Sequence, residues 1–218
     1  MRSGNDNLTG VLGTHHANRV GANHVWLAGD EVCVLFGGVP ARVAWVGYRS
    51  VDCLHHPEPR LVWPVRIRQG TFGKGLPQRD LMLSPDHAVY ADGVLIPVKY
   101  LINGTSIVQT PVDTVTYYHI ELERHDVVFA EGLPTESYLD TGNRANFANG
   151  GEVMRLFPDF ANHGLNAPYV WEALGCARLV VTGAELARVR RKIARRGRTK
   201  RWHAVGAARL RSRGSGGG

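Results

Sequence analysis

Residues 79–107 read RDLMLSPDHAVYADGVLIPVKYLINGTSI, and residues 115–144 read VTYYHIELERHDVVFAEGLPTESYLDTGNR. Short runs of aliphatic and aromatic residues alternate there with Asp-Gly at 92–93 and Asn-Gly at 103–104. These dipeptides are strong turn signals, because both residue types tolerate a positive φ. Many short strands joined by tight turns predict an all-β fold.

Working outward from this stretch, we expect further strands before it and helices after it. Residues 39–48 should place Val39, Ala41, Val43 and Trp45 on one face, because side chains alternate along a strand. Thr182 and Glu185 form a capping box that predicts a helix over 183–195. A short helix is expected at 167–174 and strands at 31–36, 61–68, 81–83, 88–90, 94–97, 106–110, 114–122 and 125–130.

The composition limits the class of protein. A chain of 218 residues allows one large all-β domain, or one domain with an appendage. No apolar run approaches the roughly 18 residues that span a bilayer, so no membrane contact is expected. The first residues lack the apolar segment of a signal peptide. We therefore expect a cytoplasmic protein, which leaves open secretion by an uncleaved or non-classical route. Three cysteines without paired spacing also fit a reducing compartment.

The basic charge is concentrated at the C-terminal end. Twelve Lys and Arg residues lie between 188 and 213, and removing them from the net charge of +7 leaves −5. The predicted organisation is therefore a flexible N-terminus at 1–10, a main domain at 11–149, an accessory mixed segment at 150–187 and a basic, partly disordered tail at 188–218. The tail is either a solvated appendage or a contact for an acidic partner or nucleic acid, where Trp202 could stack on a base.

Two polar signals are candidates for chemistry. Ser84 and His87 belong to a turn directly after the apolar run 81–83, and His125 and Asp126 lead into an apolar strand. A histidine held by a turn beside a buried strand is suited to proton transfer. Each histidine could equally be a structural residue bonded to a backbone carbonyl, with His125 paired to its neighbouring carboxylate. The scattered Cys and His residues do not complete a metal site, and no metal or cofactor is expected.

With these segments in place, the sequence resembles the Hint (hedgehog/intein) superfamily, and it looks most like a bacterial subgroup of Hint-type domain-containing proteins. The pieces that carry the resemblance are LAGDEV at 27–32, PVRIRQGTFGKGLPQRDLMLSPDHAVY at 64–90, LIPVKYLINGTSI at 95–107 and YYHIELERHDVVFAEGLPTESYLDTGNR at 117–144. The resemblance covers about residues 12–149. It implies a compact all-β, horseshoe-like fold of two pseudo-symmetric halves, which agrees with the predicted strands.

The resemblance also implies autoproteolysis, with no partner required for self-processing. In the family, an N-terminal Cys or Ser attacks the preceding carbonyl in an N–S or N–O acyl shift. A histidine in a T-x-x-H turn protonates the departing nitrogen, because an amide nitrogen leaves only when protonated. Ser84 and His87 match that turn, with Ser in place of Thr, and His125 and Asp126 resemble the C-terminal block.

The sequence departs from the family pattern at two places, and both affect the functional hypotheses. Thr9 falls on the nucleophile position, and a β-branched hydroxyl is a poorer nucleophile than a thiol. No His-Asn pair follows Gly132, so splicing is not expected. The first hypothesis is a self-cleaving or transacylating domain impaired at Thr9. The alternative is a Hint fold with a degenerate active site, used as a binding or structural module. On either hypothesis a monomer is expected.

Overall fold

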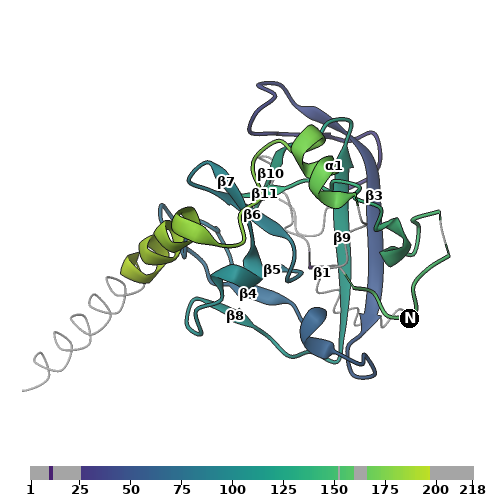
Figure 1. Cartoon of the computed structure of the whole chain (residues 1–218), viewed down its shortest axis with the longest axis horizontal. Coiled ribbons are helices and arrows are strands. Elements are labelled where there is room, and N and C mark those ends of the chain that lie inside the picture. The colour runs from purple at the N-terminus through teal and green to yellow at the C-terminus, as the bar shows by residue number, and fades with distance from the viewer. Residues whose placement is uncertain (1–9, 12–25, 152, 160–165, 197–218) are drawn as a thin grey trace, which may run out of the picture.

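A computed structural model describes residues 10–11, 26–151, 153–159 and 166–196. Its strands form three sheets, paired almost throughout in the antiparallel sense, and helices are few (Figure 1). The predicted all-β fold is confirmed. No helix among the described residues is long and apolar enough to cross a membrane.

The first sheet is built on two long strands, β3 (Ala41–Asp52) and β9 (Thr114–Leu122). They pair antiparallel from Val43↔Leu122 to Asp52↔Thr114. The short strands β2 (Glu31–Val32) and β1 (Gly10–Val11) complete the order β1-β9-β3-β2, with β1 parallel to β9. This ribbon runs the height of the molecule (Figure 1).

The two faces of β9 contribute to different parts of the core. Val115 and Tyr117 are buried in one apolar cluster, whereas Ile120 and Leu122 are buried in another. Odd and even positions of a strand point to opposite faces, so the ribbon is shared between two cores. His119 is therefore on the same face as Tyr117.

The prediction that alternate residues from Val39 to Trp45 share one face of a strand is wrong. Val39 precedes β3 and is 70% exposed. A bulge lies between Val43 and Trp45, and an extra residue in one strand reverses the faces that follow it. Val43 accordingly packs with one cluster and Trp45 with the other.

The second sheet has the order β10-β11-β6-β7 and consists of β10 (Val127–Ala130), β11 (Leu133–Glu136), β6 (Ala88–Ala91) and β7 (Val94–Pro97). A tight turn joins β10 to β11, where Glu131 has φ 49° and Gly132 has φ 75°. The Asp-Gly turn predicted at 92–93 joins β6 to β7. β11 was not predicted, and it brings Glu136 beside the start of β6.

The third sheet has the order β5-β4-β8 and consists of β5 (Leu81–Leu83), β4 (Val65–Ile67) and β8 (Ile107–Gln109). The strand expected at 61–68 is shorter than predicted, because Pro59–Leu61 forms the 3₁₀ helix η1. Two further 3₁₀ helices are η2 (Val98–Leu101) and η3 (Arg144–Asn146). β5 leads directly into the turn that holds His87.

Both C-terminal helices are present where the sequence predicts them. The first is α1 (Ala167–Leu174), and the second is described over residues 183–196. Leu186, Val189 and Ile193 of the second helix are buried against residues of the second and third sheets. Its Arg188 and Lys192 both bind Asp92 of the β6–β7 turn.

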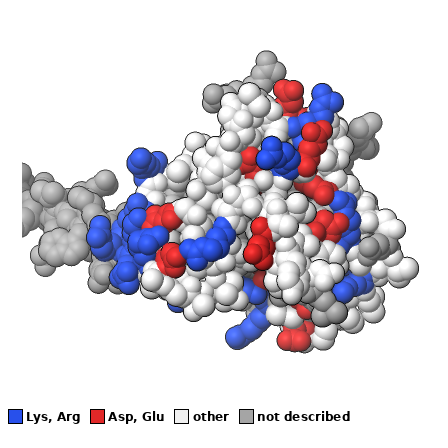
Figure 2. All heavy atoms as spheres, turned by 45° about the horizontal axis from the view of Figure 1, so that its top comes forward, with Lys and Arg blue, Asp and Glu red and all other residues white. Residues whose placement is uncertain are grey.

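The boundary expected at residue 188 therefore falls inside a docked helix. Figure 2 shows basic side chains gathered at this end of the molecule with acidic side chains among them. The part of the basic segment that the structure describes, 188–196, belongs to the folded unit. Residues 197–218, with Trp202, lie outside the described residues.

Candidate functional site

The turn that the sequence singled out joins β5 to β6. The His87 N–H donates to the Ser84 carbonyl at 3.1 Å, which closes the turn. The Val98 N–H donates to the His87 carbonyl at 3.0 Å and ties the turn to η2. Ser84 and His87 are both buried. These two hydrogen bonds fix the backbone of the turn at His87, and the surrounding side chains bury its ring.

Ser84 and His87 open on a pocket of about 40 Å³. That volume admits a few water-sized groups, far below the 300–1,000 Å³ typical of small-molecule sites. The acid–base groups of its wall are Asp86, His87, His119 and Glu136. The pocket is therefore a small cavity with several titratable side chains, suited to one small chemical group.

His119 is a pocket residue that was not predicted. It extends the inward face of β9 after Tyr117, and its ring lies 5.2 Å from the His87 ring and 5.1 Å from the Phe147 ring, centre to centre. Burial lowers the pKa of His119 to about 4, so its ring is neutral at neutral pH. A signal was present, because Val115, Tyr117 and His119 alternate on one face of a strand.

Glu136 is the second pocket residue that was not predicted. It ends β11, and its Oε1 accepts the Ala88 N–H at 2.6 Å. Burial, with a further contribution from nearby Asp86, raises the pKa of Glu136 to about 8. Asp86 itself forms an ion pair with Lys99. The pocket thus holds one carboxyl group that retains its proton at neutral pH.

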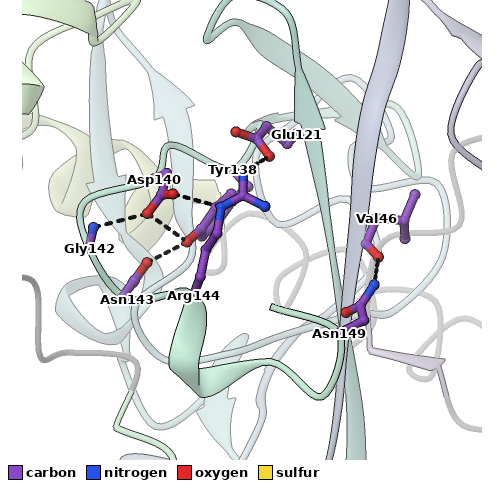
Figure 3. Close-up of polar contacts among 8 residues, drawn as sticks. All are labelled: Val46, Glu121, Tyr138, Asp140, Gly142, Asn143, Arg144 and Asn149. Carbon is purple, nitrogen blue, oxygen red and sulfur yellow. Dashed lines mark hydrogen bonds and ion pairs between the residues drawn. The ribbon is translucent and has the colours of Figure 1, made fainter. Parts of the chain in front are cut away.

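A polar network forms the wall between Tyr138 and Asn143 (Figure 3). The Tyr138 hydroxyl donates to Asn143 Oδ1 at 2.6 Å. Arg144 forms ion pairs with Glu121 and Asp140. Its guanidinium also lies over aromatic rings, 4.5 Å from the Trp45 centroid and 5.9 Å from the Tyr138 centroid. Because Tyr138 is held on both sides, the Asn143 amide is fixed at the pocket wall.

The chain after η3 is hydrogen-bonded to the backbone of β3. Asn149 Nδ2 donates to the Val46 carbonyl at 2.8 Å, and Asn149 Oδ1 accepts the Tyr48 N–H at 3.1 Å (Figure 3). This side-chain amide occupies the free edge of β3 as a neighbouring strand would. The attachment keeps Phe147, two residues earlier, against His119.

His125 has both ring nitrogens bound to backbone groups. Nε2–H donates to the Ser137 carbonyl at 3.2 Å, and Nδ1 accepts the Cys176 N–H at 3.0 Å. These partners assign the neutral Nε2–H tautomer. Burial lowers the pKa of His125 to about 4, and the ring packs edge-to-face on Trp171 at 5.2 Å. His125 connects the C-terminal segment to the strand end at Ser137.

Asp126 likewise binds the backbone. Its Oδ1 accepts the Val127 N–H at 2.6 Å and the Phe36 N–H at 3.1 Å. The structure therefore brings Ser84 and His87 together in the pocket with His119 and Glu136, while His125 and Asp126 are absent from the described pocket lining. Thr9 lies outside the described residues.

Among the residues that the structure describes, no group of three His, Cys, Asp or Glu side chains is arranged to hold a metal ion. Cys53 and Cys176 have a raised pKa, to about 11 and about 12, with burial as the main cause. Thiols with a raised pKa are poor nucleophiles at neutral pH. The side chains that line the pocket include acid–base and hydroxyl groups, and neither of these thiols is among them.

The fold and the pocket agree with the comparison to known families. A family model described as the Hint domain matches residues 23–142, which is more than half of the chain. The chain belongs to the Hint-domain family. Neither the curated proteins nor the solved structures yielded a match.

The site extends past the segment that the family model matches. Asn143, Phe147 and Trp171 all line the pocket, and all follow residue 142. Trp171 comes from α1, in the accessory segment predicted over 150–187. The accessory segment therefore contributes directly to the wall of the site.

Proposed function

We propose that this Hint domain rearranges a peptide bond of its own chain, and that His87 protonates the departing amide nitrogen. The observation that carries the proposal is the pocket, where a buried histidine in the S-x-x-H turn faces other acid–base groups. The small volume of the pocket favours a peptide group of the protein itself over a separate, larger substrate.

In the proposed reaction, Thr9 is the nucleophile. Its Oγ forms a bond to the carbonyl carbon of Leu8, and the bond from that carbon to the Thr9 nitrogen breaks. The nitrogen takes a proton from His87, and the proton of the hydroxyl is returned to the pocket. The product is an ester with a free amine, ready for cleavage by an added nucleophile. A hydroxyl is far less acidic than a thiol, so the step should be slow.

The test is a reporter fused upstream of Thr9 and treated with hydroxylamine or a thiol. Release should fall by about 10²–10⁴-fold in His87→Ala, the range for loss of a general acid. Thr9→Cys should accelerate release, and Thr9→Ala should abolish it. If neither wild type nor Thr9→Cys releases the reporter, the domain does not process its own chain.

A second candidate function is a binding or structural module that keeps the Hint fold. It is supported by Thr9 at the nucleophile position and by the backbone bonds that occupy both nitrogens of His125. On this proposal the reporter stays attached in every variant, although each variant folds.

Nucleic-acid binding by the basic tail is a property that either function could include. Asp92 pairs with two of the six basic residues between 188 and 196, and six further Lys and Arg residues follow residue 196 with no acidic residue among them. Binding to a DNA duplex should weaken steeply with salt and disappear when residues 197–218 are removed. Binding that survives the deletion would rule out the tail as its source.

A further inference from the structure

Glu136 differs from the other carboxyl group of the pocket. Asp86 has Lys99 as its ion-pair partner, whereas no described Lys or Arg forms an ion pair with Glu136. We propose that Glu136 stores the proton that this pocket delivers, and that His87 passes it to the departing nitrogen. The proposal rests on the proposed function and identifies where its proton comes from.

The position of Glu136 is determined by the sheet. β11 pairs with β6 through Thr135↔Val89, which sets the next residue of β11 beside Ala88. Glu136 Oε1 accepts the Ala88 N–H at 2.6 Å, and Ala88 directly follows His87 in the chain. The carboxyl group is thereby held at the base of the histidine turn. One oxygen is used as an acceptor, which leaves the other for a proton.

The groups around Glu136 favour its neutral form. Asp86 adds negative charge, and its partner Lys99 is engaged with Asp86. His119 is neutral at neutral pH because burial lowers its pKa to about 4. The half-buried Cys176 thiol, which also interacts with Glu136, keeps its proton because its pKa is raised. With a pKa raised to about 8, Glu136 is protonated at neutral pH and loses its proton only above that value.

This distribution of protons differs from the usual one. An exposed glutamate is ionised and an exposed histidine is partly protonated near neutral pH. In this pocket the carboxyl carries the proton, and His119 does not. An acid is most effective when its pKa lies near the working pH, which suits Glu136 better than His119.

The proton balance closes within the pocket. Glu136 gives its proton to one side of the His87 ring while His87 gives a proton to the amide nitrogen, and the carbon–nitrogen bond breaks. The proton of the Thr9 hydroxyl leaves as the carbon–oxygen bond forms, and it returns to the Glu136 carboxylate. No oxidant, metal or external acid is consumed.

The first experiment does not depend on activity. We expect the infrared spectrum of the wild-type protein at pH 7 to contain a protonated-carboxyl band that disappears as the pH is raised through about 8. Glu136→Gln should lack this band between pH 6 and 8, where ordinary carboxyl groups are ionised. A wild-type spectrum without the band, or a band lost below pH 6, would overturn the proposal, even if the variant does not fold.

The second experiment measures reporter release against pH. Glu136→Gln keeps an acceptor for the Ala88 N–H, so the turn should be preserved while the proton is lost. We expect wild-type release to decline above pH 8, and we expect Glu136→Gln to release about 10²-fold more slowly and to lack this decline. Glu123→Gln, at an exposed position, is the matched control and should behave as wild type.

The outcomes separate the two proposals. Release by wild type with an unaltered rate and pH profile in Glu136→Gln would overturn proton storage by Glu136 and leave self-processing in place. A carboxyl band without release in any variant would support proton storage and overturn self-processing.

Discussion

His87 and His125 occupy comparable positions in the chain, each beside the first residues of a strand of the same sheet, yet they have different surroundings. His87 lines a pocket together with other titratable groups. His125 is bonded at both nitrogens to the backbone of Ser137 and Cys176. The first ring faces a space that a reacting group can enter, and the second joins two segments of the fold.

The difference shows that the role of a histidine depends on the groups that reach its ring. Cys176 lies 51 residues after His125, and its N–H occupies the nitrogen that would otherwise act as a base. A buried donor left without its acceptor costs about 1–3 kcal/mol, so the His125 ring has a structural reason to remain neutral. His125 lies beside the pocket wall because it is hydrogen-bonded to Ser137, which lines the pocket directly after β11.

The largest predicted effect is the pH dependence of stability, which arises because His119 and His125 have lower pKa values in the folded than in the unfolded chain. Burial lowers the pKa of both His119 and His125 to about 4, so the unfolded chain binds more protons between pH 6.5 and 4. The free energy of unfolding should therefore decrease as the pH is lowered from 6.5 to 4, by up to about 3 kcal/mol for each histidine. Urea unfolding of wild type, His119→Gln and His125→Gln at pH 7 and pH 4.5 measures the loss. An unchanged pH dependence in both variants would contradict it.

The next effect tests the structural role of His125 against that of His87. His125→Ala removes two hydrogen bonds and a ring contact with Trp171, and should cost about 2 kcal/mol. For a domain of this size the Tm should fall by about 4–8 °C. His87→Ala is the matched variant and should cost about 1 kcal/mol of stability, while release falls by about 10²–10⁴-fold. Equal thermal losses in the two variants would remove the distinction drawn between these histidines.

Asp126→Asn should have a smaller effect. The amide oxygen of Asn can still accept the Val127 and Phe36 N–H groups, but without the negative charge that strengthens both bonds. We expect a loss of about 1 kcal/mol in the free energy of unfolding and no change in reporter release. Reduced release at unchanged stability would place Asp126 in the chemistry after all.

The smallest effect concerns the opposite wall of the pocket. Tyr138→Phe keeps the ring beneath Arg144 but removes the hydrogen bond to Asn143, at a cost of about 1 kcal/mol or less. Because the Asn143 amide would then turn freely, release should fall several-fold. Asp92→Asn, at the docked helix, is a control of similar thermal cost and should leave release unchanged.

Much of the fold was predictable because its signals are local. Asp-Gly at 92–93 gave the β6–β7 hairpin its turn, and the S-x-x-H turn at 84–87 is closed by its own backbone. Helix 183–196 followed from a capping box and three apolar residues at helical spacing. Turn chemistry and periodicity act over a few residues, and one sequence is enough to identify them.

The missed features depend on distant segments. β11 has Pro134 within it and too few residues to show alternation, so Glu136 was not recognised as a strand-end group. The role of His125 depends on Cys176, and the role of His119 depends on Phe147 and His87. The basic run after 188 resembles a solvated tail, yet Asp92 and the core hold its first turns in place.

The docked helix, residues 183–196, determines which segments must be kept if this domain is transferred into another protein. The segment recognised as Hint ends at residue 142, but the core cluster that contains Leu83 and Ile96 also contains Val189 and Ile193. A graft cut at the recognised end would expose that cluster and open the pocket on the side of Trp171. The transplantable unit extends at least to residue 196, so chimeras joined at 142 should aggregate where those joined after 196 remain soluble.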